Sequence, residues 1–273
     1  MSTDVTTEMY GSRLYGFDQP LERERIGLIG DVFDPFTRRR LADLGPLSGL
    51  RCLDVGAGPG TVAAWLADQA GPFGEVVALD RDTSLLREAA HPGVRAWQAD
   101  IHAAPDAELP APGFDLIHAR LTLCHLPGRE EVLPRLVSML APGGLLLVSD
   151  VINTMACASP HPAVRALTRA YDQALVTTLD SDLNYARSYP APLAAAGLTG
   201  IGMAADVPLV RADHPTVRFW TLTFSAMRTE ILATGLIDAA GFDAAIGHLQ
   251  APATHELGYT LVTAWGRARA VAP

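Results

Sequence analysis

A dense run of glycines interrupts the apolar sequence between Leu53 and Trp65, and this turn constrains the fold more than any other stretch. Gly56, Gly58 and Gly60 permit backbone torsions and close approaches that a Cβ atom would forbid. The apolar residues before the turn predict a buried strand, and those after it predict a helix whose first N–H groups are open to a ligand. A nucleotide-like ligand is the first expectation, although similar turns also serve dinucleotide folds or only reverse the chain.

An acidic residue stands where the ribose of such a ligand would need it. Asp80 ends the apolar run of residues 76–79 and follows Gly60 by twenty residues. This spacing puts its carboxylate at the tip of the next strand, within reach of two ribose hydroxyls. The glycine turn and Asp80 are independent features, and both favour a ligand that contains a ribose.

The balance of charge points to a small partner. The 273 residues carry a net charge of −9, and the pI is near 5.3. There is thus no electrostatic reason to expect binding to nucleic acid or to an anionic membrane, so we expect a small-molecule substrate, and the sequence allows a homodimer. The N-terminal residues lack the apolar core of a signal peptide, and no run approaches the ~20 apolar residues of a membrane span. We therefore expect a cytoplasmic protein.

The cysteines give no sign of a cross-link or a metal. Cys52, Cys124 and Cys157 are odd in number and lack Cys-x-x-Cys spacing. Neither a disulfide framework nor a structural zinc site is therefore predicted, and a reducing compartment is expected.

Strands and helices alternate from residue 50 to residue 150, which predicts a doubly wound parallel α/β sheet with covering helices. Sheets of this kind bind ligands at the carboxyl ends of their strands. The predicted strands are 51–55, 75–80, 94–98, 114–118 and 145–149, and the predicted helices are 61–70, 83–90 and 130–140.

Outside this core the pattern is looser. Two helices are predicted within residues 21–44, the second starting at Asp34, because an Asp-Pro pair suits a helix N-cap and first turn. The later segments predict helices at 163–179 and 219–234, a sixth strand at 199–207 and an edge strand at 258–266.

Five elements in this order resemble the motifs of the class I S-adenosylmethionine-dependent methyltransferases. The glycine loop preceded by Asp54 matches the first motif, and Asp80 matches the acid that closes the second strand. The other motifs are matched by residues 99–101, by the segment from Phe114 to Arg120 and by the phrase from Leu140 to Val148. The resemblance covers residues 40–150, and its phrases are most similar to the small-molecule enzymes of ubiquinone and natural-product tailoring type.

The resemblance implies a seven-stranded Rossmann-like sheet in the order 3-2-1-4-5-7-6, with the seventh strand antiparallel. It also implies a single methyltransferase domain over residues 1–273. The parts of this domain would be N-terminal lid helices at 1–45, a cofactor-binding core at 46–150, a helical cap with the sixth strand at 151–257 and the antiparallel strand at 258–273.

The same resemblance implies S-adenosylmethionine as cofactor and S-adenosylhomocysteine as product. Asp80 would bind the ribose, while Arg81 and Ile101 would border the adenine. Asp100 would accept a hydrogen bond from the exocyclic amine of the adenine, unless it is only a surface acid. The implied cofactor-binding residues are Asp54, Gly56, Ala57, Gly58, Gly60, Asp80, Arg81, Asp100, Ile101 and Arg120.

Two of these residues allow more than one interpretation. Asp54 would orient the glycine loop or meet the ammonium group of the cofactor, or it would cap backbone N–H groups of the turn. Arg120 would pair with the carboxylate of the cofactor through two parallel hydrogen bonds, or it would form a salt bridge with a local acid such as Asp150.

His125 and Tyr15 are the predicted catalytic residues. His125 is the first candidate for a general base, although a histidine in an apolar phrase also suits a hydrogen-bonded scaffold role. Tyr15 or Phe17 would fold over a ligand, or these rings would only pin the N-terminus to the core. Further candidates for a base are His161, His214 and Tyr185.

The predicted reaction is methyl transfer to an oxygen, nitrogen or carbon atom of a hydrophobic or aromatic metabolite or a quinone-like compound. In-line displacement needs alignment in a dry cavity more than it needs a base. No metal is predicted, because the fourth strand ends in His118 and Arg120 rather than in oxygen donors for magnesium. A pericyclase or binding protein on the same fold is the alternative. A nicotinamide oxidoreductase fits less well, because its loop would read Gly-x-Gly-x-x-Gly.

Overall fold

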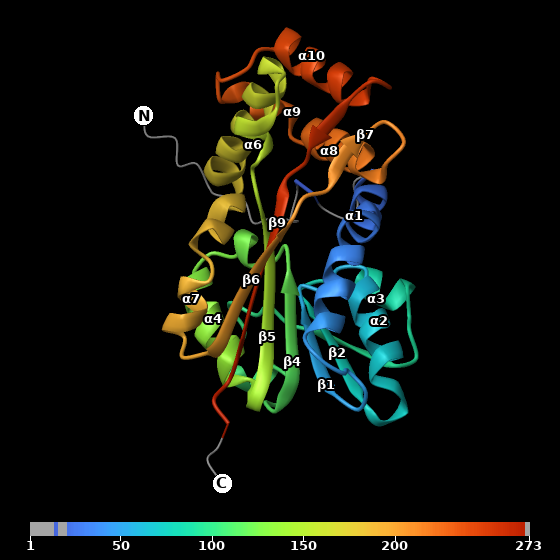
Figure 1. Cartoon of the computed structure of the whole chain (residues 1–273), viewed down its shortest axis with the longest axis vertical. Coiled ribbons are helices and arrows are strands. Elements are labelled where there is room, and N and C mark those ends of the chain that lie inside the picture. The colour runs from blue at the N-terminus through green and yellow to red at the C-terminus, as the bar shows by residue number, and fades with distance from the viewer. Residues whose placement is uncertain (1–13, 16–20, 271–273) are drawn as a thin grey trace. The chain divides into compact units, whose positions relative to one another are not determined.

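Seven strands form one sheet, in the order β3-β2-β1-β4-β5-β9-β6 (Figure 1). This order is the predicted one, with β9 in the position of the seventh strand. The strands are β1 (Arg51–Val55), β2 (Glu75–Asp80), β3 (Val94–Gln98), β4 (Phe114–Arg120), β5 (Leu140–Ile152), β6 (Thr199–Asp206) and β9 (Thr260–Arg267). The computed structural model describes residues 14–15 and 21–270.

The first five strands are parallel, and β9 reverses the direction. The N–H group of Ala268 donates to the carbonyl of Gly144 at 2.8 Å, and the hydroxyls of Ser149 and Thr263 lie 2.9 Å apart. Residue numbers rise along β9 as they fall along β5, so the two strands are antiparallel. The edge strand β6 is antiparallel to β9 in turn, because the hydroxyl of Thr199 donates to the carbonyl of Arg267 while Gly202, further along β6, lies against Trp265, which is earlier in β9.

Apolar side chains hold helices against this sheet. The helix α2 (Thr61–Ala70) turns Val62 and Leu66 toward a buried cluster that includes Leu116 of β4. The spacing of four residues puts both side chains on one face of the helix, which is the pattern expected of a helix half-buried on a sheet. Further helices of the chain are α1 (Glu22–Asp43), α3 (Ser84–Glu88), α4 (Arg129–Ser138) and α7 (Ala191–Ala195).

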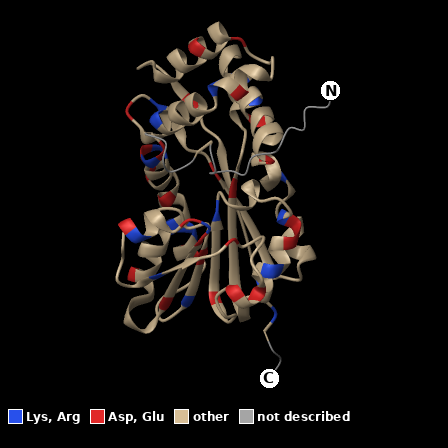
Figure 2. Cartoon of the chain, turned by 180° about the vertical axis from the view of Figure 1, so that it is seen from behind, with Lys and Arg blue, Asp and Glu red and all other residues tan. Residues whose placement is uncertain are grey.

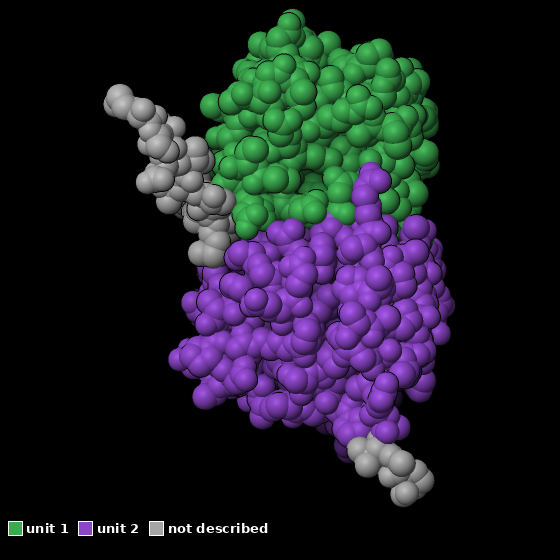
Figure 3. All heavy atoms as spheres, turned by 90° about the vertical axis from the view of Figure 1, so that its left-hand side faces the viewer, with its two compact units in different colours: residues 1–33, 151–184, 206–261 green, residues 34–150, 185–205, 262–273 purple. Residues whose placement is uncertain are grey.

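The chain divides into two compact units (Figure 3). Unit 1 takes in the described residues up to 33 together with residues 151–184 and 206–261, and unit 2 takes in 34–150, 185–205 and 262–270. Unit 1 contains the short paired strands β7 (Leu209–Arg211) and β8 (His255–Leu257), with the helices α5 (Met155–Ala158), α6 (Pro162–Leu179), α8 (Pro215–Ala226), α9 (Arg228–Ala233) and α10 (Ala239–Gln250).

Aromatic stacking and the half-buried acid Asp172 organise unit 1. The ring of Trp220 stacks on Tyr259, with 4.1 Å between the centroids. The carboxylate of Asp172 accepts hydrogen bonds from Asn153 at 2.8 Å, Asn184 at 3.0 Å and the hydroxyl of Tyr259 at 3.1 Å. Burial of an acid is costly unless its oxygens are paired, and these three donors meet that need.

Two helix predictions are wrong. Residues 22–43 form one helix that continues through Pro35, instead of two helices with a start at Asp34. The reason is that the Asp34 carboxylate bonds to Arg38 and Arg120 side chains, so it does not cap a new helix. The predicted helix at 219–234 is two helices, α8 and α9, which meet at Met227.

No described helix is long and apolar enough to cross a membrane. Figure 2 shows arginines and acidic residues interspersed along the described ribbon.

Gly202 of β6 provides a test of how β6 and β9 pack. A Cβ atom at Gly202 would lie 2.3 Å from ring atoms of Trp265 in β9. We expect Gly202→Ala to lower the free energy of unfolding by about 1 to 3 kcal/mol, measured by urea titration, because the indole ring must shift. Gly247→Ala is the control, since its Cβ would meet nothing within 4 Å. Equal stability of the two variants would contradict the close packing of β6 on β9.

Candidate cofactor and substrate site

The glycine turn joins β1 to α2 through three residues with positive φ. These are Gly56 at 66°, Gly58 at 53° and Gly60 at 78°, a region that L side chains rarely adopt. A Cβ atom at Gly56 would lie 2.3 Å from the hydroxyl oxygen of Thr122, so glycine is also needed there for space. At Gly58, by contrast, no described atom beyond its chain neighbours lies within 4 Å of the Cβ position. The turn is therefore packed at Gly56 and open at Gly58.

Asp80 is bonded to this turn. Its carboxylate accepts the N–H of Gly58 at 2.8 Å and the N–H of Asp82 at 3.0 Å. Burial raises the pKa of Asp80, and these two backbone hydrogen bonds oppose the shift. The N–H groups of Gly56 and Ala57 both donate to the carbonyl of Leu79. The structure thus brings the predicted loop residues and the predicted ribose acid together.

The residues predicted for the adenine lie at the ends of β2 and β3. Arg81 is exposed directly after Asp80. The backbone of Ala99 donates to the carbonyl of Asp80 at 3.0 Å, which places Asp100 beside the end of β2. Asp100 accepts the N–H of His102 at 2.8 Å, so its carboxylate also caps the following turn. Ile101 is buried.

Asp54 takes a partner that sequence reasoning missed. Its Oδ1 lies 2.7 Å from Nδ1 of His118, and both side chains are buried. The two residues face each other because β1 and β4 pair in register at these positions. Neither predicted role of Asp54, toward the cofactor or the turn, accounts for this bond. The alternation of side chains between the two faces of each strand was the available signal, but it predicts that Asp54 faces His118 only once the register of β1 and β4 is known.

Arg120 pairs with an acid, although not with Asp150. Its guanidinium donates to Asp34 Oδ1 at 2.7 Å and to the hydroxyl of Thr37 at 3.0 Å. Asp34 also accepts from the hydroxyl of Thr61, the first residue of α2, and from Arg38. One carboxylate thus joins α1, the end of β4 and the helix that follows the glycine turn. Sequence reasoning missed Asp34 because Asp-Pro is also a common helix start.

His125 lies in the loop after β4, in a short 3₁₀ turn over Leu123–His125. It is half-buried, and its backbone N–H donates to the carbonyl of Thr122 at 3.0 Å. The neighbouring Cys124 donates its N–H to Asp150 at 3.5 Å, and the hydroxyl of Tyr189 donates to the other oxygen of Asp150 at 2.7 Å. His125 therefore stands on a loop that is tied to the end of β5.

Tyr15, His161 and His214 belong to unit 1 and have structural contacts there. The hydroxyl of Tyr15 donates to the carbonyl of Thr223 at 3.0 Å, and Arg25 lies 4.2 Å above its ring. His214 caps α8 by accepting the N–H of Thr216. His161 stacks on His248 with 4.2 Å between the ring centroids. Tyr185 belongs to unit 2, and Phe17 lies outside the described residues.

Comparison with known proteins places the chain in a family. A family model described as a methyltransferase domain matches residues 29–187, more than half of the chain. The chain therefore belongs to the methyltransferase-domain family. Among the described residues, no group of three or more His, Cys, Asp and Glu side chains could hold a metal ion.

The chain is also similar to individual methyltransferases over part of their length. The chain is 32% identical over 130 residues to methyltransferase Str3 of Strobilurus tenacellus, covering 48% of this chain and 46% of that protein. It is 29% identical over 167 residues to nocamycin O-methyltransferase of Saccharothrix syringae, covering 52% and 60%. These matches span less than two thirds of either relative's length. The YcgJ protein of Bacillus subtilis shares the fold, with a TM-score of 0.53 at 18% identity over 91% of this chain and 100% of that chain.

The carboxyl group of Asp150 allows a test by pH. Burial raises its pKa from 3.8 to about 6, although Tyr189 and Cys124 donate hydrogen bonds that favour the charged form. The folded state therefore binds more protons there than the unfolded chain between about pH 4 and 6, so the free energy of unfolding falls as pH rises through this range.

Asp150→Asn removes this titration. Relative to the variant, we expect the wild type to lose roughly 2 to 3 kcal/mol of unfolding free energy between about pH 4 and 7, measured by urea titration. A difference between the two proteins that does not change with pH would show that Asp150 does not titrate in this way.

Proposed function

We propose that this chain transfers the methyl group of S-adenosylmethionine to a small-molecule acceptor. The observation that carries the proposal is the glycine turn bonded to the Asp80 carboxylate, next to the open space at Gly58. Without the open space at Gly58, no ligand could approach the backbone of the glycine turn. Membership of the methyltransferase-domain family supports the same conclusion.

The residues of unit 2 suit the parts of this cofactor. Asp80 would accept hydrogen bonds from both ribose hydroxyls, because each of its two oxygens accepts one backbone N–H and keeps a second lone pair. Arg81, Asp100 and Ile101 would border the adenine. When bound, the sulfonium of the cofactor supplies an electrophilic methyl group with a good leaving group.

Arg120 would bind the cofactor carboxylate while it stays paired with Asp34. A guanidinium has five N–H donors, and the bonds to Asp34 and Thr37 use two of them. Asp34 would thus hold the guanidinium in a fixed orientation. The buried pair of Asp54 and His118 would support the floor of the site from β1 and β4.

The acceptor is proposed to be a hydrophobic or aromatic molecule with an oxygen nucleophile. The likeness to nocamycin O-methyltransferase favours oxygen over nitrogen or carbon. His125 is the proposed base, since its loop follows the carboxyl end of β4. Ligands of this fold class bind at the carboxyl ends of the strands. His125 would take the proton from the acceptor hydroxyl as the carbon–oxygen bond forms.

Calorimetric titration with S-adenosylhomocysteine tests the role of Asp80. We expect Asp80→Ala to weaken binding by about 1 to 3 kcal/mol, because hydrogen bonds to a charged group are lost. Asp82→Ala is the matched control, since it removes a neighbouring exposed acid that only caps Ser84. No binding to the wild type would overturn the proposed function, and equal affinities of the two variants would overturn the ribose role.

The role of Arg120 is tested by two ligands that differ in the amino acid part. We expect Arg120→Met to weaken binding of S-adenosylhomocysteine about 10- to 100-fold, because a charged hydrogen bond to its carboxylate is lost. Binding of 5′-methylthioadenosine, which lacks that carboxylate, should stay unchanged.

Asp34→Asn is the control for the ion pair in this experiment. It breaks the same salt bridge but keeps the guanidinium, so it should bind S-adenosylhomocysteine much better than Arg120→Met does. If both variants lose the same affinity, the effect comes from the broken ion pair and not from a contact with the cofactor.

A further inference from the structure

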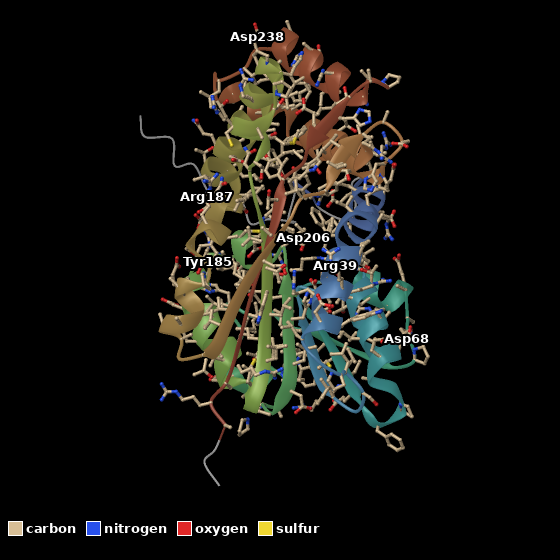
Figure 4. The ribbon with its side chains drawn as sticks, in the orientation of Figure 1. Arg39, Asp68, Tyr185, Arg187, Asp206 and Asp238 are labelled. Carbon is tan, nitrogen blue, oxygen red and sulfur yellow. The ribbon has the colours of Figure 1, made fainter. Side chains whose placement is uncertain are left out.

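The hydroxyl of Tyr185 is a buried polar group without a hydrogen-bond partner among the described residues. The side chain is 8% exposed and comes from a 3₁₀ turn over Leu183–Ser188 (Figure 4). A hydroxyl taken out of water without a partner costs free energy that a hydrogen bond would recover. Such a group in a folded protein calls for an explanation, and a ligand atom is one.

The ring of Tyr185 is held firmly, so its hydroxyl has a defined position. The guanidinium of Arg129 lies 5.5 Å from the ring centroid, and the ring of Tyr189 meets it edge-on at 5.7 Å. Tyr189 is itself fixed by its 2.7 Å hydrogen bond to Asp150. Two neighbouring tyrosines thus differ in one respect, because the hydroxyl of Tyr189 is paired and that of Tyr185 is not.

The neighbours of Tyr185 lie at the carboxyl ends of the strands. Arg129 begins α4 after the loop that follows β4, and Asp150 lies near the carboxyl end of β5. In doubly wound sheets these strand ends are where ligands bind. His125, the proposed base, lies in the same loop between β4 and α4.

The chemistry of the hydroxyl decides what it can do. Burial and the nearby carboxylate of Glu130 raise the pKa of Tyr185 to about 12. The phenol therefore keeps its proton at neutral pH, so it is a hydrogen-bond donor and a poor base. The charges of Glu130 and Asp150 also disfavour an anion at this position, whereas the guanidinium of Arg129 favours one. Because a buried charge that is not fully paired is costly, a neutral oxygen atom is the suitable acceptor.

We infer that the hydroxyl of Tyr185 donates a hydrogen bond to a neutral oxygen, such as a carbonyl, of the small molecule that this protein methylates. The inference rests on the proposed function and adds the substrate class, a molecule with an uncharged oxygen acceptor beside an apolar or aromatic body. Tyr185 is then a residue that determines specificity, and not a base.

Two probes of the same shape test this assignment. Acetophenone and α-methylstyrene differ only in that a carbonyl oxygen replaces a methylene group. Their affinities are measured by ligand-observed NMR with and without saturating S-adenosylhomocysteine. We expect the wild type to prefer acetophenone, and Tyr185→Phe to bind it about 2- to 10-fold more weakly while its affinity for α-methylstyrene is unchanged.

The matched control is Tyr189→Phe, which removes a hydroxyl that has a partner. Its thermal midpoint should fall, whereas that of Tyr185→Phe should stay the same or rise, because no hydrogen bond is lost there. Equal affinity of the wild type for the two probes, an equal loss of both in Tyr185→Phe, or binding of neither probe would overturn the inference. Binding of S-adenosylhomocysteine is read separately, so failure of the cofactor proposal is distinguished from failure of this one.

Discussion

The pairing of β1 with both β2 and β4 is the constraint on which the candidate site depends. Because β1 lies between these two strands, its carboxyl end has Asp80 on one side and Arg120 on the other. The glycine turn then has to leave the sheet at once, and the hydrogen bond from Gly58 to Asp80 holds it at the end of β2. A shift of one residue in either pairing would turn these side chains to the opposite face and separate them.

Two buried polar pairs on one face of the sheet fix elements that apolar contacts alone would leave free to slide. Asp54 with His118 joins β1 to β4, and Asp34 with Arg120 joins α1 to β4. Pairs of this kind gain little net stability, because polar and charged groups lose their hydration when they are buried. Each pair is satisfied in only one register, however: the first fixes β1 against β4, and the second fixes where the unit 2 part of α1, from Asp34 on, lies against the sheet. That placement in turn sets the orientation of the guanidinium of Arg120.

The sequence was sufficient where local pattern and spacing carry the information. The alternation of strands and helices, the glycine turn and the approach of Asp80 to it follow from periodicity and from one twenty-residue interval, whereas the strand order was implied by the resemblance to the methyltransferase family. The partners of Asp54 and Arg120 did not follow, because they depend on strand register and on the face that α1 turns to the sheet. Asp34 shows the difficulty most clearly, since its local sequence predicts a helix start. Its carboxylate instead accepts a hydrogen bond from Arg120, 86 residues later in the chain. The unpaired hydroxyl of Tyr185 likewise has no sequence signal, because a missing partner is visible only in three dimensions.

The place of β9 between β5 and β6 has a consequence for how the chain folds. The strands β1 to β5 come from one continuous stretch and can pair as soon as that stretch exists. The strand β6 cannot join them until β9, some fifty residues later in the chain, has been made and inserted. During synthesis the free edge of β5 therefore stays open longer than the edges of β1, β2 and β4, which pair within the continuous stretch, and long-range pairing of this kind is slow. An exposed strand edge is prone to pair with other chains, so this interval is the step at which the nascent protein depends most on protection from aggregation.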